Sequence, residues 1–302
     1  MASSQAKPSR LQPVDSFTVI DDMRFHCLEW GDRDNPTILF LHGGGLTAHT
    51  WDRICPSLVD SFYCVSLDQR GHGESDWSPT IDYSLDAHLK DIEGFVSAIG
   101  LERFLLVGMS MGAFNSLGYA LNHSADLAGL VLIDIAPELR RDGIDRLHSF
   151  TNVPDVLPSV DAFVDRALSF NPQRDPEVLR NSLRYNLREV PGGGWTWRYD
   201  RRHRTSQNRE TELEARAKLR LTLWGQAGTI SCPTLVIRGA DSDFTDGEEL
   251  RGVVSQIPGW QFAEVANAGH TVQGDNPVGL LEVLTPFAEG LNFRADPINR
   301  GQ

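Results

Sequence analysis

The sequence comprises 302 residues, of which 40% are hydrophobic and 23% are charged, values typical of a globular protein with a packed core. It carries 41 acidic against 28 basic residues, a formal net charge of -13 at pH 7. Because nucleic acids and anionic membrane surfaces are bound through clustered Lys and Arg, this balance argues against both as partners. No apolar run approaches the ~20 residues that a membrane span needs.

The four cysteines, Cys27, Cys55, Cys64 and Cys232, form no CxxC pair and therefore show no metal or redox spacing. Three lie in apolar segments and are expected to pack as small hydrophobic residues, which favours a reducing, cytoplasmic compartment. Residues 1–16 are polar and contain no apolar h-region. They predict a flexible tail rather than a secretory signal.

From residue 17 onward, short apolar runs alternate with longer amphipathic stretches. Helix candidates include residues 85–99 and 113–122. Five runs are apolar on both faces, as buried parallel strands are: Thr37–Leu41, Tyr63–Leu67, Phe104–Val107, Leu130–Ile133 and Thr234–Ile237. The alternation predicts an α/β fold with a doubly wound, mostly parallel sheet.

This alternation breaks over residues 139–223, where apolar residues have helical spacing and several prolines separate the segments. Some 85 residues are too many for a loop, so the stretch predicts an inserted helical cap. The α/β core would then consist of residues 17–138 and 224–302. Trp195, Trp197 and Tyr199 either line a pocket or pack the cap onto the core, and the second interpretation is favoured.

The sequence Gly108-Met-Ser-Met-Gly112 stands directly between a predicted strand and a predicted helix. A sharp strand-to-helix turn presents a serine hydroxyl as a nucleophile, and glycines two residues to either side let strand and helix approach. The amino end of the following helix favours developing negative charge. Ser110 is therefore the candidate nucleophile.

A glycine-rich turn, His42-Gly-Gly-Gly45, follows the strand predicted at residues 37–41. Acyl transfer needs backbone amides aimed at the oxyanion, and glycines let the backbone come close to it. The amides of Met111 and Gly44 are the predicted oxyanion donors, with Gly45 as the neighbouring candidate. His42 is expected to orient this turn by hydrogen bonding.

Of the nine histidines, His270 stands in a loop beyond the last strand candidate, where a Ser–acid–His order places the base. His72 reads as part of a structural turn. The acid that would orient the imidazole is expected after the strand at residues 234–237, where Asp241 and Asp243 compete. Asp243 is favoured, and Asp134, at the end of an earlier strand, stays open as a third candidate.

These motifs resemble the α/β-hydrolase superfamily, specifically its capped serine hydrolases, over about residues 17 to 290. Residues 68–75, 108–112 and 268–270 carry the resemblance, and the pair Ser242-Asp243 resembles a subgroup in which that aspartate is the triad acid. The resemblance implies a cap over the catalytic cleft whose inner face sets substrate preference. Ser110 in place of an aspartate argues against epoxide hydrolases and haloalkane dehalogenases.

The combined motifs predict a serine esterase or lactonase that forms an acyl-enzyme on a small-molecule substrate. The chemistry calls for no cofactor and no metal. A carbon–carbon or amide bond hydrolase with the same triad and a triad-retaining ligand receptor are the alternatives. The sequence leaves a homodimer open.

Overall fold

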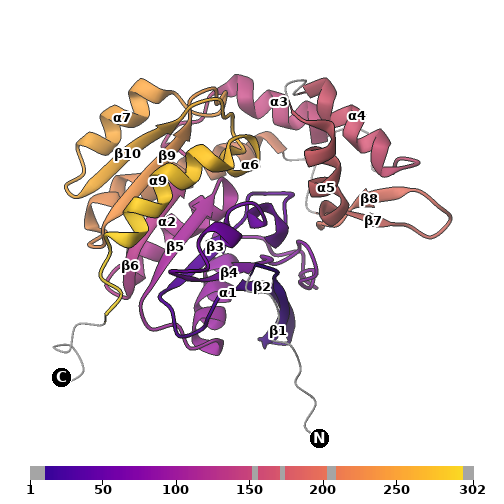
Figure 1. Cartoon of the computed structure of the whole chain (residues 1–302). Coiled ribbons are helices and arrows are strands. Elements are labelled where there is room, and N and C mark those ends of the chain that lie inside the picture. Colours follow the sequence, from indigo (N-terminus) through magenta and orange to yellow (C-terminus); the bar gives the residue numbers. More distant parts are fainter. Residues whose placement is uncertain (1–10, 152–155, 171–173, 203–208, 295–302) are drawn as a thin grey trace, which may run out of the picture.

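The computed structural model describes residues 11–151, 156–170, 174–202 and 209–294, and its centre is an eight-stranded sheet (Figure 1). The strand order is β1-β2-β4-β3-β5-β6-β9-β10. β1 and β2 are antiparallel to their neighbours, and all pairs from β4 to β10 are parallel. The bounds are β1 (Val14–Ile20), β2 (Met23–Trp30), β3 (Thr37–Leu41), β4 (Tyr63–Leu67), β5 (Phe104–Met109), β6 (Leu127–Ile133), β9 (Thr234–Gly239) and β10 (Trp260–Val265).

Helices cover both faces of this sheet. On one face α1 (Leu85–Ala98), α2 (Met111–His123) and α7 (Gly247–Ser255) enclose one hydrophobic cluster. On the other face η1 (Ala48–Trp51), η2 (Cys55–Ser57), α8 (Val272–Asp275) and α9 (Pro277–Glu289) enclose a second. Because the central strands are buried on both sides, their sequences are apolar on both sides. The predicted doubly wound α/β fold is confirmed.

The five predicted strands coincide with β3, β4, β5, β6 and β9, whereas the predicted elements do not include β1, β2 and β10. Every residue of β1 is at least partly exposed, so it lacks the continuous apolar run of a buried strand. β1 begins at Val14, so the last three residues of the predicted tail, 14–16, belong to a strand. The reason is that their backbone pairs with β2, and the first pair is Val14 with Glu29.

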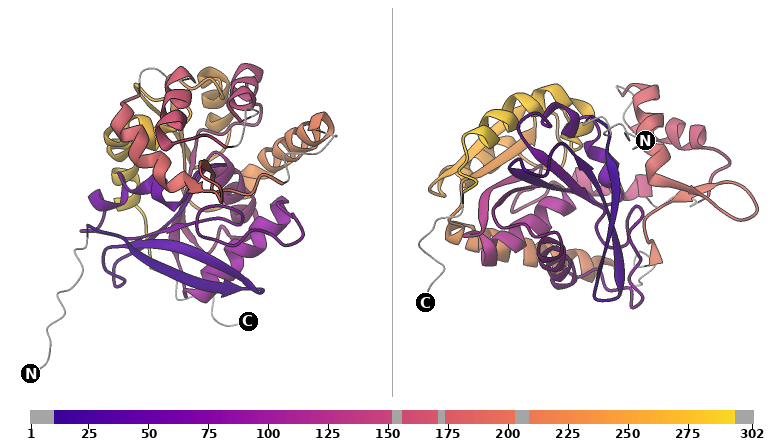
Figure 2. Two further views of the ribbon diagram at one scale, coloured as in Figure 1. Left: turned by 90° about the vertical axis from the view of Figure 1, so that its right-hand side faces the viewer. Right: turned by 60° about the horizontal axis from the view of Figure 1, so that its bottom comes forward.

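Between β6 and β9 the described residues form four α-helices and a short hairpin, followed by the 3-10 helix η4 (Ala227–Thr229). The α-helices and the strands of the hairpin are α3 (Arg141–Thr151), α4 (Val160–Phe170), α5 (Pro176–Asn186), β7 (Leu187–Glu189), β8 (Trp195–Trp197) and α6 (Arg209–Gln226). The hairpin was not predicted, and it projects from the body beside α5 (Figures 1 and 2). Its turn contains Gly192, Gly193 and Gly194, all at positive φ, a conformation that glycine adopts without steric cost.

Residues of α4, α5 and the hairpin enclose a third hydrophobic cluster, separate from the two clusters of the sheet. The carboxyl end of α6 belongs instead to a sheet cluster, through Leu223 and Trp224. None of the described helices combines the length and apolar character that crossing a bilayer would require. The division of the chain into a core and a cap at residues 139–223 stays a prediction.

Candidate active site

Ser110 occupies a sharp turn between β5 and α2. Its backbone has φ 53° and ψ -113°, a left-handed conformation that non-glycine residues adopt rarely and at functional sites. The turn is braced from both sides. The amide of Ser110 donates to the carbonyl of Ile133 at 2.9 Å, and its own carbonyl accepts from the amide of Phe114 at 2.9 Å.

The two flanking glycines are required by close backbone approach. A Cβ atom on Gly108 would lie 2.4 Å from the carbonyl oxygen of Gly112. A Cβ atom on Gly112 would lie 2.3 Å from the carbonyl oxygen of Leu41 in β3. Side chains at either position would therefore separate α2 from the strands and shift the serine.

His270 lies beside Ser110, although 160 residues separate them. Nε2 of the imidazole is 2.9 Å from Oγ of Ser110. The loop that carries His270 follows β10, and the amide of Gly269 donates to Oδ2 of Asp275 at 3.0 Å. The ring of Phe244 stacks on the imidazole, with centroids 3.8 Å apart and planes inclined by 17°. The histidine side chain is 18% exposed.

The carboxylate in contact with His270 belongs to Asp134, the residue after β6. Its Oδ2 lies 2.6 Å from Nδ1 of the imidazole, and its side chain is fully buried. Because a carboxylate accepts hydrogen bonds, the geometry assigns the proton to Nδ1 and leaves Nε2 to accept from the serine hydroxyl. Like Ser110, Asp134 has a left-handed backbone, with φ 52°. Its amide donates to the carbonyl of Ile237 in β9 at 2.8 Å and so extends the hydrogen-bond ladder between β6 and β9 by one residue.

The prediction that Asp243 contacts His270 is wrong. Oδ2 of Asp243 lies 3.1 Å from Nε of Arg146 in α3, and Asp241 is exposed. The reason is the direction of the loop after β9. That loop turns the side chain of Ser242 toward Asp134, and the hydroxyl donates to Oδ2 of Asp134 at 2.6 Å.

Two buried histidines fix the glycine-rich turn after β3. Nδ1 of His42 donates to the carbonyl of Gly43 at 2.8 Å, and Nε2 accepts from the amide of Gln69 at 3.0 Å. Nδ1 of His72 donates to the carbonyl of Arg70 at 2.9 Å, and Nε2 accepts from the amide of Gly45 at 3.1 Å. Each ring therefore serves as one donor and one acceptor, which is the neutral form. Burial lowers the pKa of both imidazoles, so the neutral form is favoured.

These hydrogen bonds distinguish between the candidate oxyanion donors. The amide of Gly45 is already bound to His72. A Cβ atom on Gly44 would lie 3.8 Å from Sδ of Met111, so Gly44 neighbours the residue after the serine. As the first residue of α2, Met111 has an amide without a partner inside the helix. Gly44 and Met111 stay the predicted donors.

Aromatic residues of the β8 region pack against one another and onto the glycine-rich turn. The ring of Trp197 meets Phe163 edge-on, with centroids 5.1 Å apart. The ring of Tyr199 stacks on His72 at 5.7 Å, and a Cβ atom on Gly45 would lie 3.3 Å from it. Tyr199 thus covers the turn that carries the predicted donors, as the packing interpretation expected.

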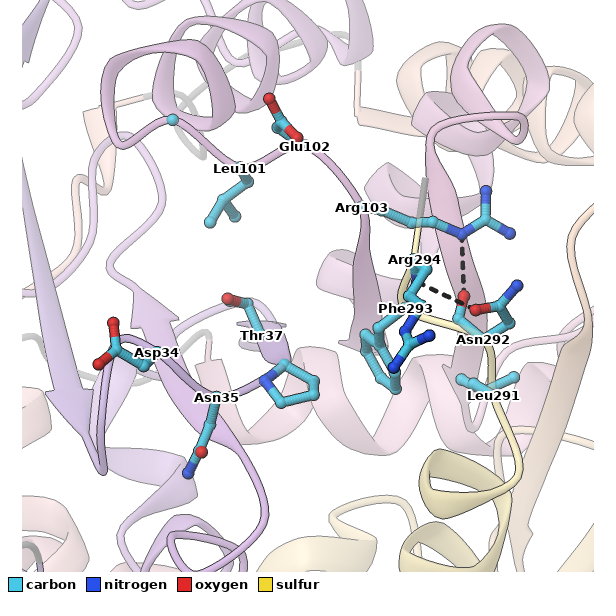
Figure 3. Close-up of a pocket in the computed structure, with 12 residues that line it drawn as sticks. Asp34, Asn35, Thr37, Leu101, Glu102, Arg103, Leu291, Asn292, Phe293 and Arg294 are labelled. Atoms are coloured by element: carbon cyan, nitrogen blue, oxygen red, sulfur yellow. Dashed lines mark hydrogen bonds between the residues drawn. The ribbon is translucent and has the colours of Figure 1, made fainter. Parts of the chain in front are cut away.

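A hollow of about 660 Å³ lies at the other end of the sheet (Figure 3). Thr37 and Arg103 line it at the amino ends of β3 and β5, together with residues 291–294 after α9. Ser110 follows the carboxyl end of β5, so this hollow does not adjoin the serine. Among the described residues no three His, Cys, Asp or Glu side chains are grouped so that they could hold a metal ion.

Comparisons with known proteins identify the family of the chain. Residues 36–277 match the family model described as alpha/beta hydrolase fold. The chain is 29% identical over 271 residues to the esterase Rv0045c of Mycobacterium tuberculosis, covering 85% of this chain and 84% of that protein. It is likewise 29% identical over 267 residues to the mouse sn-1-specific diacylglycerol lipase ABHD11, covering 85% of this chain and 82% of the lipase.

Among solved structures, the crystal structure of E-2-(acetamidomethylene)succinate hydrolase has a TM-score of 0.78 at 23% identity, covering 92% of this chain and 100% of the other. The Rv0045c structure has a TM-score of 0.71 at 25% identity, covering 92% of this chain and 91% of the other. The family model spans well over half of the sequence, and the strand order and the strand-to-helix turn at Ser110 agree with it. The chain belongs to the α/β-hydrolase fold family.

Proposed function

We propose that the protein is a serine hydrolase that cleaves a carboxylic ester or lactone of a small molecule. Ser110 is the nucleophile, His270 the general base and Asp134 the acid that orients the base. The observation that carries the proposal is one continuous hydrogen-bonded line, 2.9 Å from Oγ of Ser110 to Nε2 of His270 and 2.6 Å from Nδ1 to Asp134. The relatives named esterase and diacylglycerol lipase support an ester as the substrate.

In the first half of the reaction, Nε2 of His270 takes the proton of Ser110 while Oγ bonds to the substrate carbonyl carbon. Asp134 stabilises the imidazolium that forms, and it remains ionised throughout. The tetrahedral intermediate collapses when the carbon–oxygen bond to the leaving group breaks. His270 then delivers its proton to the departing alkoxide, which leaves as the alcohol.

The second half repeats these steps with water. His270 removes a proton from a water molecule, whose oxygen attacks the acyl carbon bound to Ser110. When the second tetrahedral intermediate collapses, Oγ takes the proton back and the carboxylic acid is released. The same three side chains therefore act in both halves, and the serine returns to its starting state.

The amides of Gly44 and Met111 would hold the oxyanion in both intermediates. Loss of one such donor typically lowers the rate by ~10²–10³-fold. The helix dipole of α2 adds favourable potential, because the serine stands at its amino end. Residues 139–223 form the cap in this proposal, and their inner face contacts the substrate.

Ser110→Ala tests the proposal. The variant should lose turnover of 4-nitrophenyl acetate, an activated short-chain ester, while its circular dichroism spectrum stays that of the wild type. Undiminished turnover in the variant would refute the assignment.

Relative rates on matched ester, amide and β-diketone substrates distinguish an ester hydrolase from an amide or carbon–carbon bond hydrolase. A single slow turnover, with ligand-dependent binding of a protein partner, would instead indicate a receptor.

A further inference from the structure

We propose that the loop of residues 240–245, which follows β9, positions the acid and the base of the site. In this role Ser242 and Thr245 orient Asp134, and Phe244 orients His270. The proposal rests on the proposed function, because it assigns positioning residues to that triad. None of the three would touch the reacting atoms.

The two hydroxyls hold both oxygens of the buried carboxylate. Ser242 donates to Oδ2 of Asp134 at 2.6 Å, and Thr245 donates to Oδ1 at 2.9 Å. Because Oδ2 also faces Nδ1 of His270, a rotation of the carboxylate would break this contact with the imidazole. Two donors on different oxygens oppose that rotation. They also satisfy a buried charge that would otherwise be costly to desolvate.

Phe244 restrains the imidazole from its face. The two rings are nearly parallel, with centroids 3.8 Å apart, and Phe244 is 9% exposed. An imidazole that is hydrogen-bonded only at its two nitrogens can still tilt about the line between them. A ring packed against one face opposes this tilt. During catalysis the imidazole becomes a cation, and the face of an aromatic ring attracts a cation.

Arg238 fixes the shape of the loop. From β9 its Nη1 donates to the carbonyl of Ala240 at 2.9 Å, and its Nη2 donates to the carbonyls of Ser242 and Thr245, each at 3.0 Å. Its charge is balanced by Glu264 on β10, with Oε1 3.0 Å from Nη1. The guanidinium thus holds three backbone carbonyls of the loop from a residue of the sheet.

Helix α3 holds the same loop from the other side. The amide of Arg140, the residue before α3, donates to the carbonyl of Phe244 at 2.8 Å. A Cβ atom on Gly143 would lie 2.5 Å from the carbonyl of Asp243, so the helix packs directly on the loop backbone. Phe244 and the two hydroxyls therefore stand on a segment that is held both by Arg238 of β9 and by the start of α3, as a positioning element must be.

Paired variants with 4-nitrophenyl acetate as the probe test the proposal. Phe244→Leu keeps an apolar side chain but removes the ring, and we expect kcat to fall by roughly 10–100-fold, since small misplacements of catalytic groups have effects of this size. Phe244→Tyr keeps the ring and should retain more than half of kcat. Thr245→Val keeps the shape without the hydroxyl and should lower kcat about 10-fold, and Thr245→Ser should restore it. KM should change less than about twofold in all four, because the residues act on orientation and not on binding.

Phe262→Leu on β10 is the matched control, because this ring packs against the hydrophobic cluster under α1, α2 and α7, and among the described residues no contact to the triad involves it. It should lower the melting temperature without lowering kcat. Wild-type kcat in both Phe244→Leu and Thr245→Val, with Ser110→Ala inactive, would overturn this inference and leave the proposed function standing. An active Ser110→Ala variant would overturn the proposed function itself. Should Phe244→Leu fail to fold, the contrast between Thr245→Val and Thr245→Ser decides.

Discussion

Oδ2 of Asp134 lies 2.6 Å from Nδ1 of His270, although 136 residues separate the two along the chain. The contact is possible because β6 and β10 both end at the edge of the sheet where β5 ends and is followed by Ser110. The carboxylate in contact with the imidazole therefore follows β6 and not β9, where the sequence motif favoured the acid.

Asp134→Asn should therefore lower kcat strongly, and Asp243→Asn should leave kcat almost unchanged. An Asp-to-Asn change in a Ser-His-Asp triad can lower kcat by ~10⁴-fold, because the amide imposes the wrong tautomer on the histidine, and we expect a loss of this order for Asp134→Asn. Asp243→Asn removes a partly exposed ion pair with Arg146 and should leave kcat within about threefold. Steady-state kinetics on 4-nitrophenyl acetate measure both. The reverse ranking would contradict the placement of the acid.

Much of the fold could be predicted because buried parallel strands are apolar on both faces. β3, β4, β5, β6 and β9 have this pattern, and the serine turn stands between one of them and a helix. β1 has no such pattern because it is an edge strand with one neighbour and its residues are partly exposed. Within residues 139–223, the β7–β8 hairpin is three residues long on each side, too short for a periodicity.

The acid could not be chosen from the sequence because three aspartates follow two neighbouring strands. Asp134, Asp241 and Asp243 all stand at the edge of the sheet that carries Ser110. Which side chain turns inward depends on the left-handed backbone of Asp134 and on the bonds that Arg238 makes to the loop. No local pattern encodes either feature. The stacking of Phe244 on His270 is likewise a product of tertiary packing.

Gly45→Ala and Gly44→Ala should differ in how much they lower the free energy of unfolding, because only one of the two positions in the glycine-rich turn requires glycine. Gly45 has φ +77° and lies under Tyr199, so an alanine there should lower the free energy of unfolding by about 1–2 kcal/mol. Gly44 has no left-handed backbone, and its added Cβ atom would meet the nearest atoms at 3.8 Å. The free energy of unfolding of the Gly44→Ala variant should lie within about 0.5 kcal/mol of the wild-type value. Urea titrations give both values, and equal losses would contradict the geometry of the turn.

His88→Gln should make the protein less sensitive to acid. Burial, followed by the charge of Arg70, lowers the pKa of His88 to about 3, below its ordinary value in the unfolded chain. The unfolded state thus binds the proton first, so stability is fully present above about pH 6.5 and is lost as the pH falls toward the folded pKa. Between pH 6.5 and 4.5 the wild type should lose about 2 kcal/mol more than the variant.

The measurement is the free energy of unfolding in urea at the two pH values. His42 and His72, whose pKa values burial also lowers, contribute in the same direction in both proteins. Burial by itself would lower the pKa of His26, but hydrogen bonds and charge interactions with Asp68 and Asp15 together raise it, so its contribution is lost only as the pH rises. An equal loss of stability in wild type and variant would show that folding does not lower the pKa of His88.

Asp275→Ala should impair catalysis through the loop of His270. Oδ2 of Asp275 accepts from the amide of Gly269, and Oδ1 accepts from Nε of Arg174 at 2.8 Å. Loss of the carboxylate removes the bond that shapes the loop, and we expect kcat to fall by roughly 10-fold. Arg174→Gln leaves that bond in place and should lower kcat less than threefold. A larger effect of the arginine substitution on kcat would contradict this order.

The central claim is that His270 activates Ser110, and labelling with a fluorophosphonate tests it without knowledge of the substrate. Such reagents bond covalently to an activated serine oxygen. Intact mass and peptide mapping should place a single adduct on Ser110 of the wild type, with labelling absent in Ser110→Ala and slowed at least ~100-fold in His270→Ala. An adduct on another residue, or equally fast labelling of the histidine variant, would contradict the account.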